Sequence, residues 1–171
     1  MIVLVKVGEG SGAASRYNMN KVASNQGALL SSTVARTDDP FQIGREFEAV
    51  SALKPRVKKS IVHLVIAVSP YDAEVVKPFH FRLWLYELQK RLGLDAAQMI
   101  AWQHFDTAHP HIHALLNRVR PDGTVVSLWR RGLVMKQFCM EMHKKFALHS
   151  TPRSEVKRDF LQPMKNGNMA P

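Results

Sequence analysis

Runs of apolar residues along the chain predict four β-strands. Val, Ile and Leu fill most of residues 1–7, and residues 60–68 form a longer, uninterrupted run of β-branched and apolar residues. The longer run is typical of a central strand that is covered on both faces. Shorter stretches at residues 99–105 and 111–119 predict two further strands.

Apolar residues at helical spacing predict four helices. The clearest spans residues 77–92, where large apolar side chains recur every three or four positions. Pro40 is a typical first residue of a second helix, which ends before Pro55. Residues 13–23 predict a short helix with a weak apolar face, and an apolar stripe within residues 135–146 predicts a last one.

The order of these elements predicts an α+β fold. Residues 24–39 are polar and rich in small side chains, so we expect a loop or a frayed helix end there. A Pro-Asp-Gly turn at residues 121–123 predicts that the strand before it folds back as a hairpin onto residues 124–128. The expected architecture is a central, mostly antiparallel, five-stranded sheet with flanking helices.

Composition narrows the class of protein. A chain of 171 residues has room for one ordinary domain, which we assign to residues 1–149, with residues 150–171 as a tail or truncated continuation. No apolar run is long enough to cross a membrane and no signal peptide is apparent, so we expect a cytoplasmic protein. The net charge of +10 favours a polyanionic partner, nucleic acid first. The single cysteine, Cys139, excludes an intramolecular disulfide and a cysteine-based zinc cluster.

Four of the eight histidines fall within ten residues, at positions 104, 109, 111 and 113. His111 and His113 point to the same face because alternate residues of a strand do so. An antiparallel return after the preceding strand would bring His104 beside them. Three neutral imidazoles with open coordination positions are typical of a catalytic metal site, and they suit Mn, Zn, Ni, Co or Fe better than Mg. The alternative is that these rings only bond to backbone carbonyls.

The sequence allows more than one role for three side chains near this site. Asp106 is placed either to orient His104 or to take a proton from an attacking hydroxyl. His109 is a supporting residue, a DNA contact or a loop residue. His63 lies in an apolar strand, so we interpret it as a core or supporting histidine rather than a ligand.

The histidine segment closely resembles the third motif of plasmid mobilisation relaxases, which are His-hydrophobe-His (HUH) endonucleases. It reads His104-x-Asp106-x-x-His109-Pro-His111-x-His113-x-x-x-Asn117-Arg118. The resemblance covers roughly residues 1–148 and implies a relaxase-like nuclease domain with the paired histidines on the central strand. It also implies a reaction in which a tyrosine attacks a phosphodiester at a transfer origin, leaves a 5′-phosphotyrosine link, and later reverses the step.

The resemblance carries further expectations about cofactor and partners. The cofactor would be a divalent metal, Mn or Mg first, with Zn, Ni and Co as alternatives. The partner would be single-stranded DNA at the origin of a bacterial plasmid, together with accessory mobilisation proteins and a conjugative secretion system.

The family's nucleophile lies just after the first strand, which in this chain points to Tyr17 within Ser15-Arg16-Tyr17-Asn18. The other two tyrosines fit less well, since Tyr71 follows a strand-ending proline and Tyr86 lies off the apolar stripe of its helix. The alternative for Tyr17 is an ordinary core or surface aromatic.

A second family motif resembles His63-Leu-Val-Ile-Ala-Val-Ser69-Pro, which makes Ser69 a candidate DNA contact or, equally, a strand terminator. Trp129 is placed either to stack on an unpaired base or to join the core. Asn117 is a further candidate DNA contact. The basic candidates, each of which also fits a solvated charge, are Arg118, Arg120, Arg130, Arg131, Lys144 and Lys145.

Two other functions fit the same fold. A rolling-circle replication initiator carries its tyrosine after the histidine motif, and no tyrosine follows residue 86 in this chain. A single-stranded DNA-binding module would keep the fold without the chemistry.

Overall fold

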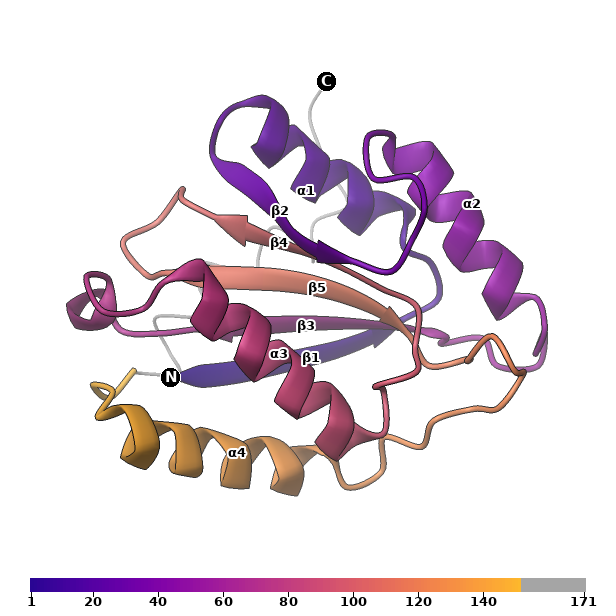
Figure 1. The fold of residues 1–171 in the computed structure, drawn as a ribbon. Helices are drawn as coiled ribbons and strands as arrows, with labels where there is room; N and C mark the ends of the chain where they lie inside the picture. Colours follow the sequence, from indigo (N-terminus) through magenta and orange to yellow (C-terminus); the bar gives the residue numbers. More distant parts are fainter. Residues whose placement is uncertain (152–171) are drawn as a thin grey trace.

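The computed structural model describes residues 1–151 and contains one five-stranded sheet of order β1-β3-β5-β4-β2 (Figure 1). Every neighbouring pair of strands is antiparallel, and β5, which carries the paired histidines, lies at the centre. The predicted α+β fold is therefore confirmed. The strands are β1 (Ile2–Gly8), β2 (Gly27–Ser32), β3 (Ile61–Ala67), β4 (Met99–His104) and β5 (His111–Asn117).

Helices cover both faces of this sheet (Figure 1). They are α1 (Gly12–Ala23), α2 (Pro40–Ser51), α3 (Pro78–Leu92) and α4 (Arg131–Phe146), with a short 3₁₀ turn at Pro70–Asp72. Two of these helices begin or end at residues that typically cap helices. The Asp39 carboxylate accepts a hydrogen bond from Phe41 N at 2.8 Å to cap α2, and Gly93 ends α3 in the left-handed conformation.

Alternation along β5 separates the hydrophobic core from the site. Ile112, Ala114 and Leu116 face α3 and α4, where they pack into the main core with Trp84 and Phe138. The intervening residues point to the face that α1 and α2 cover, and a smaller apolar cluster there includes Leu115, Ile43 and Phe47. The side chains of His111 and His113 therefore lie on the α1 side of the sheet.

One prediction about the strands is wrong and another holds only in part. The segment 24–39, predicted to be without a strand, contains the edge strand β2. The chain folds back after the turn as predicted, with a bridge between Val119 and Val125 and a hydrogen bond from Val126 N to the Arg118 carbonyl oxygen at 2.8 Å, but no full strand forms at 124–128. An edge strand is covered by few neighbours, and a register shift between Leu29 and Ser31 breaks its alternation further. The apolar signal that identifies a strand is therefore weak in β2.

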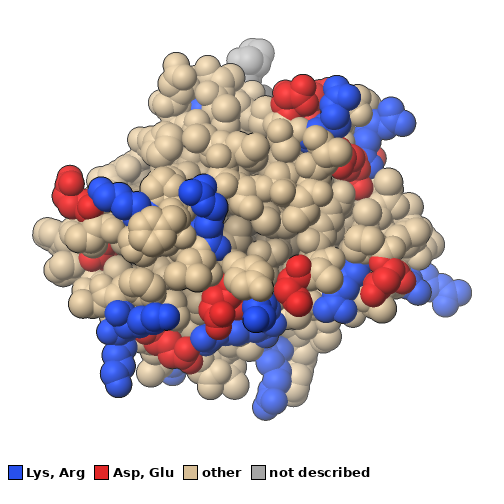
Figure 2. Space-filling view, in the orientation of Figure 1, with Lys and Arg blue, Asp and Glu red and all other residues tan. Residues whose placement is uncertain are grey.

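Charges on the face shown in Figure 2 are mixed, with lysines and arginines interspersed among acidic residues. This face therefore presents no continuous basic surface for a nucleic acid. None of the helices in residues 1–151 is both long and apolar enough to span a membrane. Residues 152–171, most of the predicted tail, lie outside the described residues.

Candidate metal centre and tyrosine

The pairing of β4 with β5 brings three imidazole rings together, as the sequence predicts. His104 lies directly opposite His111, and His113 follows two positions along the same face. The ring centroids are 4.5 Å apart for His104 and His113, 5.2 Å for His104 and His111, and 5.3 Å for His111 and His113. One nitrogen from each ring lies within 4.8 Å of the others, so the three rings can share one metal ion.

Hydrogen bonds orient two of these rings. Nδ1 of His111 donates to the carbonyl oxygen of His109 at 2.9 Å, so its Nε2 is the nitrogen that can bind a cation. Nδ1 of His113 lies 2.9 Å from Nε2 of His63. When His113 donates in that bond, its Nε2 is unprotonated. His63 thus contacts one clustered histidine through its ring, and His109 contacts another through its backbone carbonyl.

His104 shows that the donor set fits a metal. The ring is buried, and neither of its nitrogens makes a hydrogen bond within residues 1–151. A buried polar atom without such a bond is costly, and a shared cation would satisfy it. Nitrogen ligands from three imidazoles fit a transition-metal dication well.

Burial favours the neutral form of His104, His113 and the neighbouring His63, and neutral imidazoles are the form that binds metals. Burial, together with the charge of His111, lowers the pKa of His104 to about 3. Burial also lowers the pKa of His113 well below its usual value, with the neighbouring histidines adding to the effect. Burial and the nearby Lys6 lower the pKa of His63 to about 4.

Gly27 on β2 has no side chain and so leaves room for the His104 imidazole ring. A Cβ at this position would lie 3.1 Å from the Gln103 carbonyl oxygen, 3.2 Å from His104 Cδ2 and 3.3 Å from Lys21 Cβ. The neighbouring backbone carbonyl cannot yield easily, so the imidazole would have to move.

We expect Gly27→Ala to weaken Mn²⁺ binding by about tenfold, the lower end of the cost of disturbing a supporting contact. Isothermal titration calorimetry measures this affinity without DNA. Gly8→Ala is the matched control, because a Cβ at Gly8 meets nothing within 4 Å. Equal affinities in the two variants would contradict the crowding argument.

Tyr17 lies on α1 against the histidine cluster. Its ring centroid is 5.7 Å from that of His104 and 6.0 Å from that of His113. Burial, with a smaller contribution from the negative charge of Asp106, raises the pKa of the phenol to about 12. Tyr17 is therefore protonated at neutral pH, and a reaction at its oxygen needs a proton acceptor.

Asp106 lies in the loop between β4 and β5. Its Oδ2 is 3.0 Å from Lys21 Nζ, and its Oδ1 is 3.6 Å from Nε2 of His111. Burial raises the pKa of the carboxyl, but the hydrogen bond from Lys21 and the charge of His111 outweigh it, so the pKa is lowered and the group is ionised. The carboxylate thus lies beside His111, and no hydrogen bond joins it to His104 within the described residues.

Two predicted DNA contacts are buried in the structure. Asn117 is fully buried, and its amide donates to the Phe47 carbonyl oxygen at 3.0 Å and to Ser51 Oγ at 3.1 Å. Its role is to fasten α2 to the sheet, which argues against the predicted DNA contact. Ser69 is only 3% exposed, so its hydroxyl is not open to a surface ligand.

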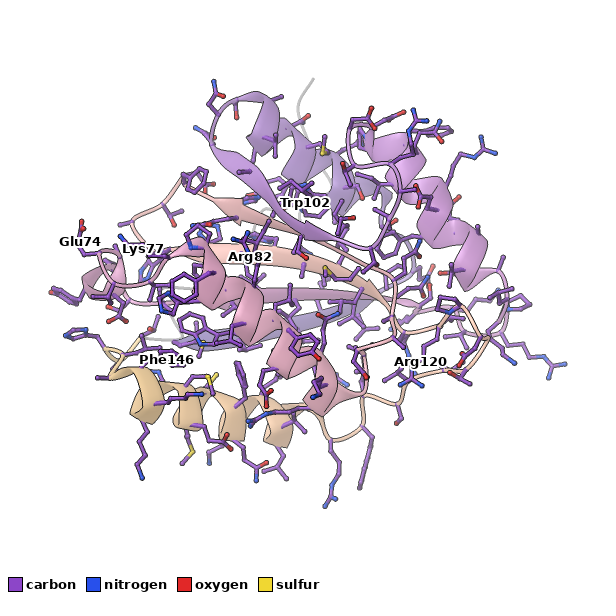
Figure 3. The ribbon with its side chains drawn as sticks, in the orientation of Figure 1. Glu74, Lys77, Arg82, Trp102, Arg120 and Phe146 are labelled. Carbon is purple, nitrogen blue, oxygen red and sulfur yellow. The ribbon has the colours of Figure 1, made fainter. Side chains whose placement is uncertain are left out.

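The basic residues predicted to contact DNA lie in three separate places. Arg118, Arg131, Lys59 and the exposed Trp129 line a groove of about 390 Å³, and the Arg130 guanidinium lies 5.7 Å from the Trp129 ring centroid. Arg120 instead donates a hydrogen bond to the Gly93 carbonyl oxygen at 2.6 Å, which holds the turn after β5 against the end of α3. Figure 3 shows Arg120 at one end of the molecule and Glu74 at the other. Lys144 and Lys145 lie on α4, beside a separate groove between α3 and α4.

Lys21 and Gly27 also belong to the site, although no motif in the sequence singled them out. One signal was available for Lys21, since it follows Tyr17 by four positions and so lies one helical turn away. No comparable signal marks Gly27, because its importance depends on how closely β2 approaches His104.

A comparison with curated proteins found no match. The family model described as the nuclease domain of MobA/VirD2-like relaxases matches residues 17–148, which include Tyr17, Asp106 and the three clustered histidines. With this match across most of its length, the chain belongs to the MobA/VirD2-like relaxase nuclease-domain family.

Proposed function

We propose that the protein is a DNA relaxase that nicks one strand at a plasmid transfer origin through a 5′-phosphotyrosine link and later rejoins it. The observation that carries this proposal is the placement of Tyr17 against three clustered imidazoles. A tyrosine beside a metal centre is the arrangement that covalent phosphodiester cleavage needs. The family match supports the same class of reaction.

The proposed step is a transesterification. The phenolic oxygen of Tyr17 attacks phosphorus and forms a P–O bond, while the bond between phosphorus and the 3′ oxygen breaks. The phenol's proton passes to the ionised Asp106 carboxylate, and the departing 3′ oxygen takes a proton from solvent water to become a free hydroxyl. One phosphate ester replaces another, so the 3′ hydroxyl can reverse the step and reseal the strand.

His104, His111 and His113 would hold the divalent cation, Mn or Mg first and Zn, Ni or Co as alternatives. When bound, the cation supplies Lewis-acid stabilisation of the charge that develops on the phosphoryl oxygens. His63 and the His109 carbonyl keep two of the ligand rings in their orientation. Rigid strands carry all three rings, which favours a preorganised site.

Single-stranded DNA is the proposed substrate, and the groove beside Trp129 is its proposed contact. The indole is 85% exposed, so its ring is open to a stacking base. Arg118, Arg130 and Arg131 would contact phosphates, and the indole would stack on an unpaired base. In a bacterial cytoplasm, accessory mobilisation proteins and a conjugative secretion system would complete the transfer.

We expect Trp129→Ala to weaken binding of a single-stranded oligonucleotide by roughly 10- to 100-fold, the usual contribution of one stacked base. Fluorescence anisotropy at fixed salt measures the change. Phe41→Ala is a matched control, because Phe41 is also exposed and also lies under an arginine, Arg45. If both variants bind alike, the Trp129 groove is not a DNA contact.

The proposed function is tested with supercoiled plasmid that carries the protein's own transfer origin, incubated with Mn²⁺ or Mg²⁺. We expect a nicked plasmid with protein covalently attached to the new 5′ end, and no nick after chelation of the metal. DNA binding without any adduct would overturn the proposal and favour the DNA-binding module. An adduct on a residue other than a tyrosine would overturn the mechanism.

A further inference from the structure

Lys21 makes a partly buried ion pair across the site. It lies one turn after Tyr17 on α1, with Nζ 3.0 Å from Asp106 Oδ2 and 2.9 Å from Gln26 Oε1. The side chains of Lys21 and Asp106 are only 23% and 14% exposed. A pair so enclosed is less screened by salt and holds its geometry better than a surface pair.

The same carboxylate also approaches a metal ligand. Asp106 Oδ1 lies 3.6 Å from Nε2 of His111, the nitrogen that is oriented to bind a cation. Asp106 nevertheless does not belong to the group of ligand atoms that all lie within 4.8 Å of one another. An ionised carboxylate is a good ligand for a dication, so something must restrain it from joining the histidines.

We propose that Lys21 holds the Asp106 carboxylate out of the metal's coordination set and so keeps a coordination position open for the scissile phosphate. This inference rests on the proposed function. The restraint matters because a site closed by a fourth protein ligand is typical of structural metals, whereas a catalytic site needs an open position. Lys21 is thus a positioning residue that acts through Asp106.

The position of Lys21 on α1 couples this restraint to the nucleophile. The two fully buried residues of helix α1, Ser15 and Asn18, are polar, and its apolar side chains Ala14, Met19 and Val22 are only half-buried against the smaller core cluster. The ion pair joins this helix to the loop that carries Asp106. Lys21 Nζ also lies 5.9 Å from the Tyr17 ring centroid. The lysine that restrains Asp106 and the attacking phenol therefore lie side by side on the same helix.

Lys21→Met is expected to strengthen metal binding while it slows the reaction. Removing the lysine frees a carboxylate and also removes a positive charge near the cation, and both changes strengthen cation binding. We expect Mn²⁺ to bind about tenfold more tightly, as the loss of one nearby like charge allows. At saturating Mn²⁺, formation of the covalent adduct is expected to slow by about tenfold or more, while the oligonucleotide affinity stays within about twofold. Lys21→Arg keeps the ion pair and should behave like the unaltered protein.

A double-variant cycle with Asp106→Asn separates restraint from simple charge repulsion. Titration calorimetry with Mn²⁺ alone gives affinities for the protein with neither, either or both substitutions. If Lys21 acts through Asp106, Lys21→Met tightens binding less in the Asp106→Asn background than in the unaltered protein. An equal gain in both backgrounds would overturn the inference. Weaker Mn²⁺ binding by Lys21→Met would overturn it too, because that is the result of structural damage.

Lys54→Met is the charge control, since Lys54 is exposed and lies in the turn that follows α2. An Mn²⁺ affinity for Lys21→Met that matches this control counts against the restraint.

The Mn²⁺ affinities also distinguish a failure of this inference from a failure of the proposed function. If the unaltered protein forms no adduct yet the Mn²⁺ cycle gives the expected coupling, the proposed function fails and the restraint stands. If it forms the adduct and the cycle shows no coupling, only the restraint fails.

Discussion

Tyr17→Phe is expected to abolish the covalent protein–DNA adduct while Mn²⁺ and oligonucleotide affinities stay unchanged. The substitution removes only the phenolic oxygen and keeps the ring that packs against His104 and His113. Because no other group supplies that oxygen, we expect a loss on the order of a thousandfold or more in the rate of adduct formation. Denaturing gel electrophoresis of the protein with a labelled oligonucleotide measures that rate.

The other two tyrosines serve as controls. Tyr71 and Tyr86 are 81% and 57% exposed, and Phe at either position should leave the adduct intact. Loss of the adduct in Tyr71→Phe but not in Tyr17→Phe would transfer the nucleophile to Tyr71. Adduct formation in all three single variants would mean that no single tyrosine is required.

The elements that the sequence predicted well are those buried by many neighbours. Strand β3 is fully buried along its length, and the apolar stripe of α3 packs into the main core, so both carry strong hydrophobic patterns. Strand β2 was missed because only Gly27 and Leu30 of its six residues are buried, so it lacks the apolar run that marks the other edge strand, β1. The hairpin after β5 was overestimated, because a turn signal fixes the local bend at Gly123 but not how far pairing continues.

The candidate site was predictable where it depended on local geometry. Alternation along β5 fixes the shared face of His111 and His113, and the antiparallel return fixes the place of His104. Contacts between segments far apart in the sequence were not predictable. Lys21 reaches Asp106 only because α1 lies over β4 and β5, and Asn117 is buried because α2 packs against the end of its strand.

His113→Ala is the second substitution with a large expected effect, since it removes the most buried of the three ligand rings. We expect Mn²⁺ affinity to fall by more than about a hundredfold, beyond the range for a supporting contact, and the adduct to disappear. His63→Ala is the informative comparison, because it removes only the partner of His113 Nδ1 at 2.9 Å. Its expected cost is about 10- to 100-fold in metal affinity, with adduct formation recovering as Mn²⁺ is raised.

The comparison holds only if both variants fold, because each leaves a cavity beside β3 and β5. Circular dichroism and thermal unfolding without metal measure that cost separately. Added Mn²⁺ should raise the unfolding temperature of the unaltered protein and of His63→Ala, but not of His113→Ala, because a ligand stabilises only a fold that binds it. If His113→Ala is stabilised by Mn²⁺ as much as the unaltered protein, the cation binds elsewhere, and the three-histidine centre would have to be abandoned as the metal site.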